Sequence, residues 1–160
     1  MAHAMMRRER SGGAGFTIQP TALVHEAWLR MGGQDEWKSR GHFASAAARA
    51  MRRILVERAR RRYALKRGSG MQRVELDEVI EVDDAGVDVL ALDAALDRLA
   101  QRDERKAEIV RLRFFAGLTI EETAAVLEAS VTTVKDEWMY ARLWLYRDIH
   151  EQERRSEGEP

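Results

Sequence analysis

The sequence predicts an all-α fold of two small helical domains joined by an acidic linker. In several segments apolar residues recur at spacings of three and four, which is the period of an amphipathic helix, and no segment alternates convincingly as a strand would. Between two groups of such segments, residues 69–88 become acidic and lose the helical period, as expected of a linker. The expected divisions of the chain are a disordered start (1–16), a first domain (17–68), the linker (69–88), a second domain (89–150) and a solvated tail (151–160).

The charge distribution separates the two halves. The chain has 160 residues and no net formal charge, but residues 1–70 hold 15 Lys and Arg against 5 Asp and Glu, whereas residues 71–160 hold 12 against 22. The basic half suggests a polyanionic partner. The acidic half can bind a basic protein surface or fold back on the basic half when DNA is absent.

Composition also limits the function classes. The chain has no cysteine, which excludes disulfides and thiolate metal sites, and it has neither a secretory signal nor an apolar run of membrane-spanning length. We therefore expect a cytoplasmic protein that does not bind a membrane. No nucleophile, base and orienting group can be named together, so neither an enzyme nor a bound cofactor or metal is expected.

Two helices are expected in the first domain. Proline suits a first helical position, so one helix should run from Pro20 to about Met31. Ser39 can cap a second, long helix that ends near Arg67, before Gly68. The expected apolar faces are Leu23, Val24, Ala27, Trp28 and Met31 on the first helix, and Phe43, Ala46, Ala47, Ala50, Ile54 and Leu55 on the second.

The second domain should begin with helices over Leu90–Leu99 and Glu104–Phe115. Asp103 is a suitable cap for the latter, and Gly117 should end it. The acidic and basic residues of 151–160 are expected to form a solvated tail.

The segment from Gly117 to Tyr146 predicts a helix-turn-helix. Thr119 can cap the first helix with Glu122 completing a capping box, and Ser130 can cap the second. The first helix has an apolar face of Ala124, Ala125 and Leu127. In the second, the core stripe is Val134, Trp138, Ala141, Leu145 and Ile149, and the residues expected to point outward are Thr132, Thr133, Lys135, Asp136 and Tyr140. Such an arrangement can place the second helix in a DNA major groove, although an ordinary helical hairpin remains an alternative.

The long helix of the first domain changes character along its length. From Arg49 to Arg67 it carries nine cations and one acid, Glu57. Guanidinium groups bridge phosphates and stack on bases, so contact with nucleic acid is favoured over a merely solvated face. Trp37, His42 and Phe43 can supply stacking surfaces for unpaired bases, but packing in the core is the more common role for Trp37 and Phe43.

Together these segments resemble a known family. The order is QPTALVHEAWLRM, then W-x-x-R-G-H-F-x-x-x-A-A-R-x-M-R-R-I-L-V-E-R-A-R-R-R, then K-R-G, an acidic linker and a helix-turn-helix that begins GLTIEETA. It is similar to the extracytoplasmic-function (ECF) sigma factors of the bacterial sigma-70 superfamily, most closely the ECF-like subgroup. The resemblance covers residues 16–149.

The resemblance implies a transcription initiation factor without catalytic activity, which binds the β′ clamp and β flap of core RNA polymerase and directs it to −10 and −35 promoter elements. The first domain would be region 2-like and the second region 4-like, and an anti-sigma factor is a further expected partner. The implied contacts to polymerase are Leu23, His25, Glu26 and Arg30. Those to the −10 element are Trp37, Arg40, His42, Phe43, Arg49, Arg52, Arg53, Arg60, Arg61 and Arg62. Those to the −35 element are Ser130, Thr132, Thr133, Lys135, Asp136 and Tyr140.

The sequence departs from the family pattern in three places. Only about 18 residues precede the first motif, where relatives have several tens, so the first domain is expected to be truncated or to depend on a partner. Asp136 and Glu137 follow Lys135, where relatives often have a basic residue, which favours low or unusually selective duplex affinity. Glu128 occupies a turn position where relatives commonly have glycine. The alternative function is a degenerate sigma-like or helix-turn-helix regulator that binds polymerase or DNA without initiating transcription.

Overall fold

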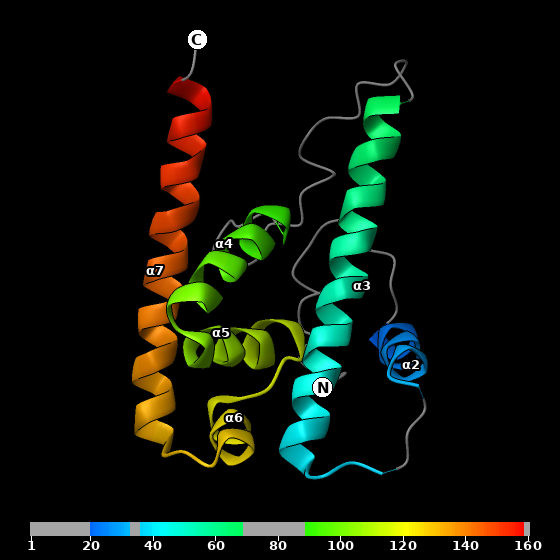
Figure 1. Ribbon diagram of the computed structural model, residues 1–160, viewed down its shortest axis with the longest axis vertical. Coiled ribbons are helices and arrows are strands. Elements are labelled where there is room, and N and C mark those ends of the chain that lie inside the picture. The colour runs from blue at the N-terminus through cyan, green and yellow to red at the C-terminus, as the bar shows by residue number, and fades with distance from the viewer. Residues whose placement is uncertain (1–19, 33–35, 69–88, 159–160) are drawn as a thin grey trace.

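The computed structural model describes residues 20–32, 36–68 and 89–158, and within these ranges the chain is helical with no strand (Figure 1). The all-α prediction is confirmed. The predicted disordered start and the acidic linker lie outside the described residues. The elements are α2 (Pro20–Arg30), α3 (Arg40–Gly68), α4 (Val89–Arg102), α5 (Glu104–Val110), the π-helical turn η2 (Arg111–Phe115), α6 (Ile120–Leu127) and α7 (Val131–Gly158).

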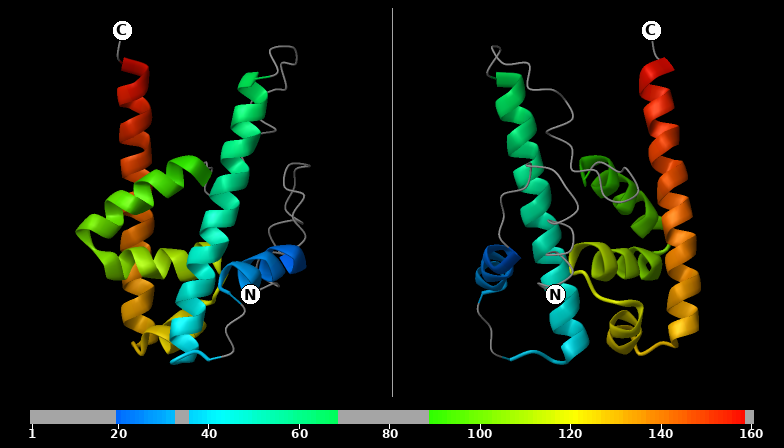
Figure 2. Two further views of the ribbon diagram at one scale, coloured as in Figure 1. Left: turned by 45° about the vertical axis from the view of Figure 1, so that its right-hand side comes forward. Right: turned by 180° about the vertical axis from the view of Figure 1, so that it is seen from behind.

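Two long helices frame the molecule. In Figure 1, α3 and α7 are rods on opposite sides, α4, α5 and α6 lie between them, and α2 packs on the flank of α3 away from α7. Figure 2 shows the two rods from two other sides. The side chain of Arg98 on α4 donates two hydrogen bonds to Asp148 on α7, at 2.5 and 2.9 Å, and so ties these two helices together.

One hydrophobic core runs through both predicted domains. Leu23 of α2 and Ile54 of α3 belong to the same buried cluster as Leu96 of α4, Phe115 of η2 and Leu145 of α7. The two halves therefore pack against each other through apolar surface, which is the main favourable term in folding. The domain boundaries expected from sequence stay a prediction.

The predicted helix caps are present. The Ser39 hydroxyl accepts a hydrogen bond from the backbone N–H of His42 at 3.1 Å, and Asp103 accepts one from that of Lys106 at 3.1 Å. Thr119 and Glu122 form the predicted capping box. These groups satisfy backbone donors that a helix start would otherwise leave unpaired.

The Asp103 cap should make stability depend on pH. Hydrogen bonds from the side chain and backbone of Lys106 lower the pKa of Asp103 below its usual value. A carboxyl with a lowered folded-state pKa stabilises the fold above its unfolded pKa, and this contribution is lost as pH falls through the folded pKa. Asp103→Asn should therefore be less stable than wild type at neutral pH, with the gap closing in acid. Urea unfolding at several pH values measures it; a gap that stays constant would contradict this origin.

The segment predicted as one helix over Glu104–Phe115 differs in its second half. There it widens into η2, where the N–H of Ala116 donates to the carbonyl of Arg111, five residues back, at 3.1 Å. The wider turn buries Arg111, Leu112 and Phe115 together. As predicted, Gly117 ends the segment, with φ +70°, a conformation that glycine adopts without steric cost.

The predicted solvated tail also differs, because α7 continues to Gly158. Local side-chain pairs accompany the extra turns: His150 Nδ1 lies 2.9 Å from a carboxylate oxygen of Glu153, and Arg147 lies 4.0 Å from Glu151. Pairs at these spacings stabilise a helix by a few tenths of a kcal/mol each. The sequence prediction considered the high polarity of the segment but not these pairs.

Candidate nucleic-acid interface

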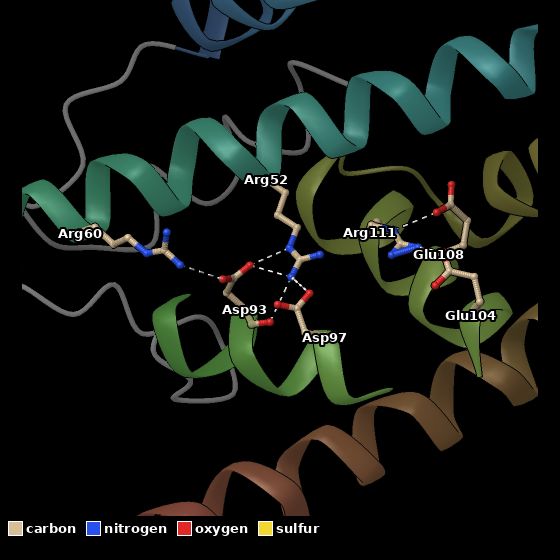
Figure 3. Close-up of polar contacts among 7 residues, drawn as sticks. All are labelled: Arg52, Arg60, Asp93, Asp97, Glu104, Glu108 and Arg111. Carbon is tan, nitrogen blue, oxygen red and sulfur yellow. Dashed lines mark hydrogen bonds and ion pairs between the residues drawn. The ribbon is translucent and has the colours of Figure 1, made fainter. Parts of the chain in front are cut away.

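Arg52 lies at the centre of the basic face of α3, and it is already paired. Its guanidinium donates to the carboxylate of Asp93 at 2.7 Å, to that of Asp97 at 2.7 Å and to the backbone carbonyl of Asp93 at 3.0 Å. Figure 3 shows its side chain reaching from α3 across to α4, between the two acids. The resemblance implies that Arg52 contacts the −10 element; in the structure its side chain is half-buried against α4, and the DNA contact stays a prediction.

The surroundings of Arg52 keep it charged. Burial alone lowers the pKa of its guanidinium, but the hydrogen bonds and negative charges of Asp97 and Asp93 outweigh burial and raise the pKa above its usual value. Only 15% of the Arg52 and Asp93 side chains is exposed, so water and salt screen this pair less than a surface ion pair.

Two neighbouring arginines on the same face are more loosely held. Arg60 lies 3.8 Å from Asp93, and Arg49 lies 4.0 and 3.9 Å from Glu104 and Glu108. Their side chains are 68% and 59% exposed, so these pairs contribute little to stability and both guanidinium groups remain accessible.

The remaining predicted arginines of α3 are open to solvent where they are described. Arg40, Arg53 and Arg61 are exposed, and the side chain of Arg62 lies outside the described residues. Arg53 and Arg61 lie near Glu57, whose pKa is lowered chiefly by a hydrogen bond from Arg30 and to a smaller degree by these two charges.

The predicted stacking residues form an aromatic cluster at the start of α3. The Trp37 ring lies 5.3 Å from that of His42 and 5.4 Å from that of Phe43, and Phe43 also meets Trp28 of α2 at 6.4 Å. Trp37 and Phe43 are half-buried, whereas His42 is exposed. Trp37 and Phe43 pack edge to face, and the tilted contact of Phe43 with Trp28 links α3 to α2.

The helix-turn-helix has the predicted geometry. The Ser130 hydroxyl accepts from the N–H of Thr133 at 3.1 Å, which caps α7. The candidate reading residues at the start of α7 are all exposed, while the opposite stripe is buried except for one member. That member, Trp138, is only half-buried, and the guanidinium groups of Arg113 and Arg142 lie 4.9 and 5.7 Å from the centre of its ring. The exposed reading residues are Ser130, Thr132, Thr133, Lys135, Asp136 and Tyr140.

Cations from α5 change the electrostatics near these residues. Arg105 donates to the carboxylate of Glu137 at 2.9 Å, and the ammonium of Lys106 lies 5.1 Å from the Tyr140 ring. One of the two acids expected to oppose DNA is therefore neutralised by an ion pair. Sequence reasoning missed Arg105 and Lys106, because their proximity to α7 depends on how α5 packs.

A family comparison agrees with this arrangement. A family model described as ECF sigma factor matches residues 1–151. The chain belongs to the ECF sigma factor family. No curated protein and no solved structure matches it significantly. The ECF sigma factors are transcription factors that act in initiation, and the family works with core RNA polymerase, promoter DNA and anti-sigma factors.

The polymerase contacts expected from the ECF sigma factor resemblance lie differently on α2. Leu23 is 2% exposed and is a core residue, which corrects its assignment as a contact. Glu26 and Arg30 pair with α3, through Glu26–Arg58 at 2.8 Å and Arg30–Glu57 at 2.8 Å.

His25 is exposed, and Leu29, one turn further along α2, is 62% exposed. Sequence reasoning missed Leu29. The sequence does contain a signal for it, because Leu29 is an apolar residue outside the stripe of α2 that faces the core.

Within the described part of the chain, no helix combines the length and the apolar character needed to cross a bilayer.

The turn of this ECF sigma factor contains a strained residue. Glu128 ends α6 with φ +53°, so the sequence-based concern about a missing glycine is justified. A left-handed conformation costs a residue with a side chain about 1 kcal/mol relative to glycine. Glu128→Gly should therefore raise the free energy of unfolding by roughly that amount, and Glu128→Val should lower it. Chemical denaturation measures both, and equal stability of the two variants would contradict the assignment.

Proposed function

We propose that this chain binds core RNA polymerase and directs it to −10 and −35 promoter elements. The observation that carries the proposal is the capped helix-turn-helix. The buried stripe of α7 packs in the core, and the residues at the start of α7 face solvent. It is supported by the ECF sigma factor match and by the arginines gathered on α3.

The two surfaces suit different forms of DNA. Residues at the start of α7 have the size and donors to read base edges of duplex DNA in a major groove, here the −35 element. On α3, Arg40, Arg53 and Arg61 can hold the phosphates of an opened −10 element while partly exposed rings stack on extruded bases.

The partners follow from this role. The outward face of α2, with His25 and Leu29, would dock on the β′ clamp, and the second domain on the β flap. An anti-sigma factor would compete for these surfaces, and a cytoplasmic location follows from the polymerase partner.

One observation favours the alternative function, a degenerate sigma-like regulator. Arg52, central among the −10 candidates, is satisfied by Asp93 and Asp97 inside the chain. A regulator that never opens DNA would have no need to free Arg52 from these two carboxylates.

Transcription from fragmented genomic DNA of the source bacterium separates the two functions. Purified core polymerase is incubated with the fragments, with and without the protein, and the 5′ ends of the transcripts are sequenced. The proposed function predicts new start sites that share two upstream elements. Stable binding to core polymerase in gel filtration without new start sites would support the degenerate regulator and overturn the proposal.

Arg53 offers a test of the −10 surface that does not disturb the fold. Its side chain is exposed, so Arg53→Ala should change stability by no more than about 0.5 kcal/mol. Loss of one phosphate contact should reduce open-complex formation several-fold and leave core binding unchanged. The measurements are run-off transcription and gel filtration with core polymerase. Arg155→Ala, an exposed cation near the end of α7, is the matched control, and equal effects of both changes would argue against a special role for Arg53.

A further inference from the structure

Two cations at the start of α5 lie against the part of α7 that is proposed to read duplex DNA. Arg105 donates to both carboxylate oxygens of Glu137, at 3.0 and 2.9 Å, and the ammonium of Lys106 lies 5.1 Å from the centre of the Tyr140 ring. We propose that these two cations are positioning residues for duplex recognition, each of which acts on DNA binding through its partner on α7 rather than by touching phosphate itself. The inference rests on the proposed role of α7 in −35 recognition.

Apolar packing places the partners next to each other. Ile109 of α5 and Val134 of α7 are both 0% exposed and share one buried cluster with Ala124 of α6. Arg105 lies one helical turn before Ile109, and Glu137 lies one turn after Val134. Residues three or four positions apart share a helix face, so the contact that buries the two apolar side chains also brings the two charged ones together. Figure 1 shows α5 meeting α7 in this region.

The ion pair of Arg105 with Glu137 matters more for DNA than for folding. The two side chains are 46% and 20% exposed, so solvent reaches the pair and its net contribution to stability is small. An unpaired carboxylate in the first turns of α7 would repel backbone phosphates, whereas the paired carboxylate adds no net charge there. Arg105 therefore allows this part of α7 to approach DNA despite the acid.

Lys106 is itself held in place by its own helix. Its ammonium donates to the carboxylate of Asp103 at 2.5 Å, and this hydrogen bond raises the pKa of Lys106 above its usual value, so the group stays charged. A fixed cation attracts the face of an aromatic ring and restricts its movement. Because 56% of Tyr140 is exposed, this contact presents the ring to solvent in a defined orientation.

Variants of the full chain test whether Arg105 acts through Glu137. The probe is a fluorescein-labelled 30-base-pair DNA duplex of mixed sequence, and binding is followed by anisotropy at several salt concentrations. Arg105→Ala should weaken binding by about three- to tenfold, since one uncompensated charge then faces the DNA. Arg105→Lys should retain most of the affinity. Arg105→Ala combined with Glu137→Gln should return close to the wild-type affinity, because the repelling charge is gone.

The double variant separates this role from a direct contact of Arg105 with phosphate. A direct contact would be absent from both variants, so the double variant would bind as weakly as Arg105→Ala. The slope of log affinity against log salt would then also fall by about 0.9, whereas it should stay near the wild-type value if Arg105 acts through Glu137. Either sign of a direct contact would overturn the inference for Arg105, as would unchanged affinity in Arg105→Ala or no measurable duplex binding by the wild-type chain.

The matched control is Arg155→Ala. Arg155 is an exposed cation near the far end of α7, and its loss changes the net charge by the same amount as Arg105→Ala. Binding close to that of wild type is expected for this control. Equal weakening in both variants would mean that net charge alone is responsible, which contradicts the inference. A cooperative thermal melt checks that each variant is folded.

A second set of variants tests whether Lys106 acts through Tyr140. Lys106→Met keeps the length of the side chain but removes its charge, and it should weaken binding to the same duplex. In a chain that already carries Tyr140→Ala, Lys106→Met should have no further effect, because its partner is gone. Equal losses in the two backgrounds, or no loss in either, would show that Lys106 does not work through the ring.

These measurements do not involve polymerase, so they separate the inference from the proposed function. Rescue of Arg105→Ala by Glu137→Gln, together with the loss of the Lys106 effect in Tyr140→Ala, supports the inference even if no transcripts appear. Failure of both couplings overturns it even if the protein initiates transcription from promoters with two upstream elements.

Discussion

Arg111→Ala is expected to lower the free energy of unfolding by about 3 to 5 kcal/mol. Only 5% of the Arg111 side chain is exposed, and its guanidinium donates to Glu108 at 2.9 Å and also to Glu104. The Glu108 side chain is itself 12% exposed, so removing Arg111 leaves a nearly buried carboxylate without its main partner. Arg49, 3.9 Å from Glu108 and 59% exposed, is a poor replacement.

A double variant distinguishes an unpaired charge from simple loss of volume. Arg111→Met with Glu108→Leu removes both charges and keeps apolar bulk, so it should be about as stable as wild type or more so. Arg105→Ala breaks the more exposed pair with Glu137 and should cost no more than about 1 kcal/mol. Urea unfolding measures all three. If Arg111→Ala costs no more than Arg105→Ala, Arg111 does not have the structural role described.

Phe115→Ala is expected to cost a similar amount, about 3 to 5 kcal/mol, through a different mechanism. Phe115 is 0% exposed and belongs to the core cluster shared by both halves of the chain. Truncation removes apolar contacts and leaves a cavity. Because the core is shared, circular dichroism and tryptophan fluorescence should report one transition, moved to lower denaturant as a whole.

The control for Phe115 is Leu143→Ala, since Leu143 is 65% exposed and its loss should cost less than about 0.5 kcal/mol. Separate transitions of the two halves in wild type or in Phe115→Ala would contradict a shared core. A single transition that Phe115→Ala barely moves would also contradict the expectation.

Features of the fold set by neighbouring residues could be predicted from the sequence. Ser39, Asp103, Thr119 and Ser130 cap helices because each acts on a backbone donor within three residues, so the motif and the structure coincide. The positive φ of Glu128 follows equally from its place in a tight turn.

Features that depend on contacts between distant segments could not be predicted. The pairing of Arg52 with Asp93 joins residues 41 positions apart, and no local pattern specifies which acids α3 will meet. The charge distribution predicted only that the acidic half can fold back on the basic half, without indicating which residues pair. Periodicity correctly placed Leu23 on the apolar face of α2, whereas the resemblance gave it a contact role. Leu29 was missed as an exposed apolar residue, because only packing determines which side of a short helix is covered.

The proposed function requires α3 to contact opened DNA and α7 to contact duplex DNA, and photo-crosslinking tests this division most directly. A photoreactive amino acid replaces exposed Arg53 or exposed Thr132 in the full chain, and each protein is assembled with core polymerase on a promoter found by transcript sequencing. We expect crosslinks from position 53 to an unpaired strand of the −10 element and from position 132 to duplex DNA of the −35 element. Crosslinks from position 132 with none from position 53 to opened DNA would contradict this expectation.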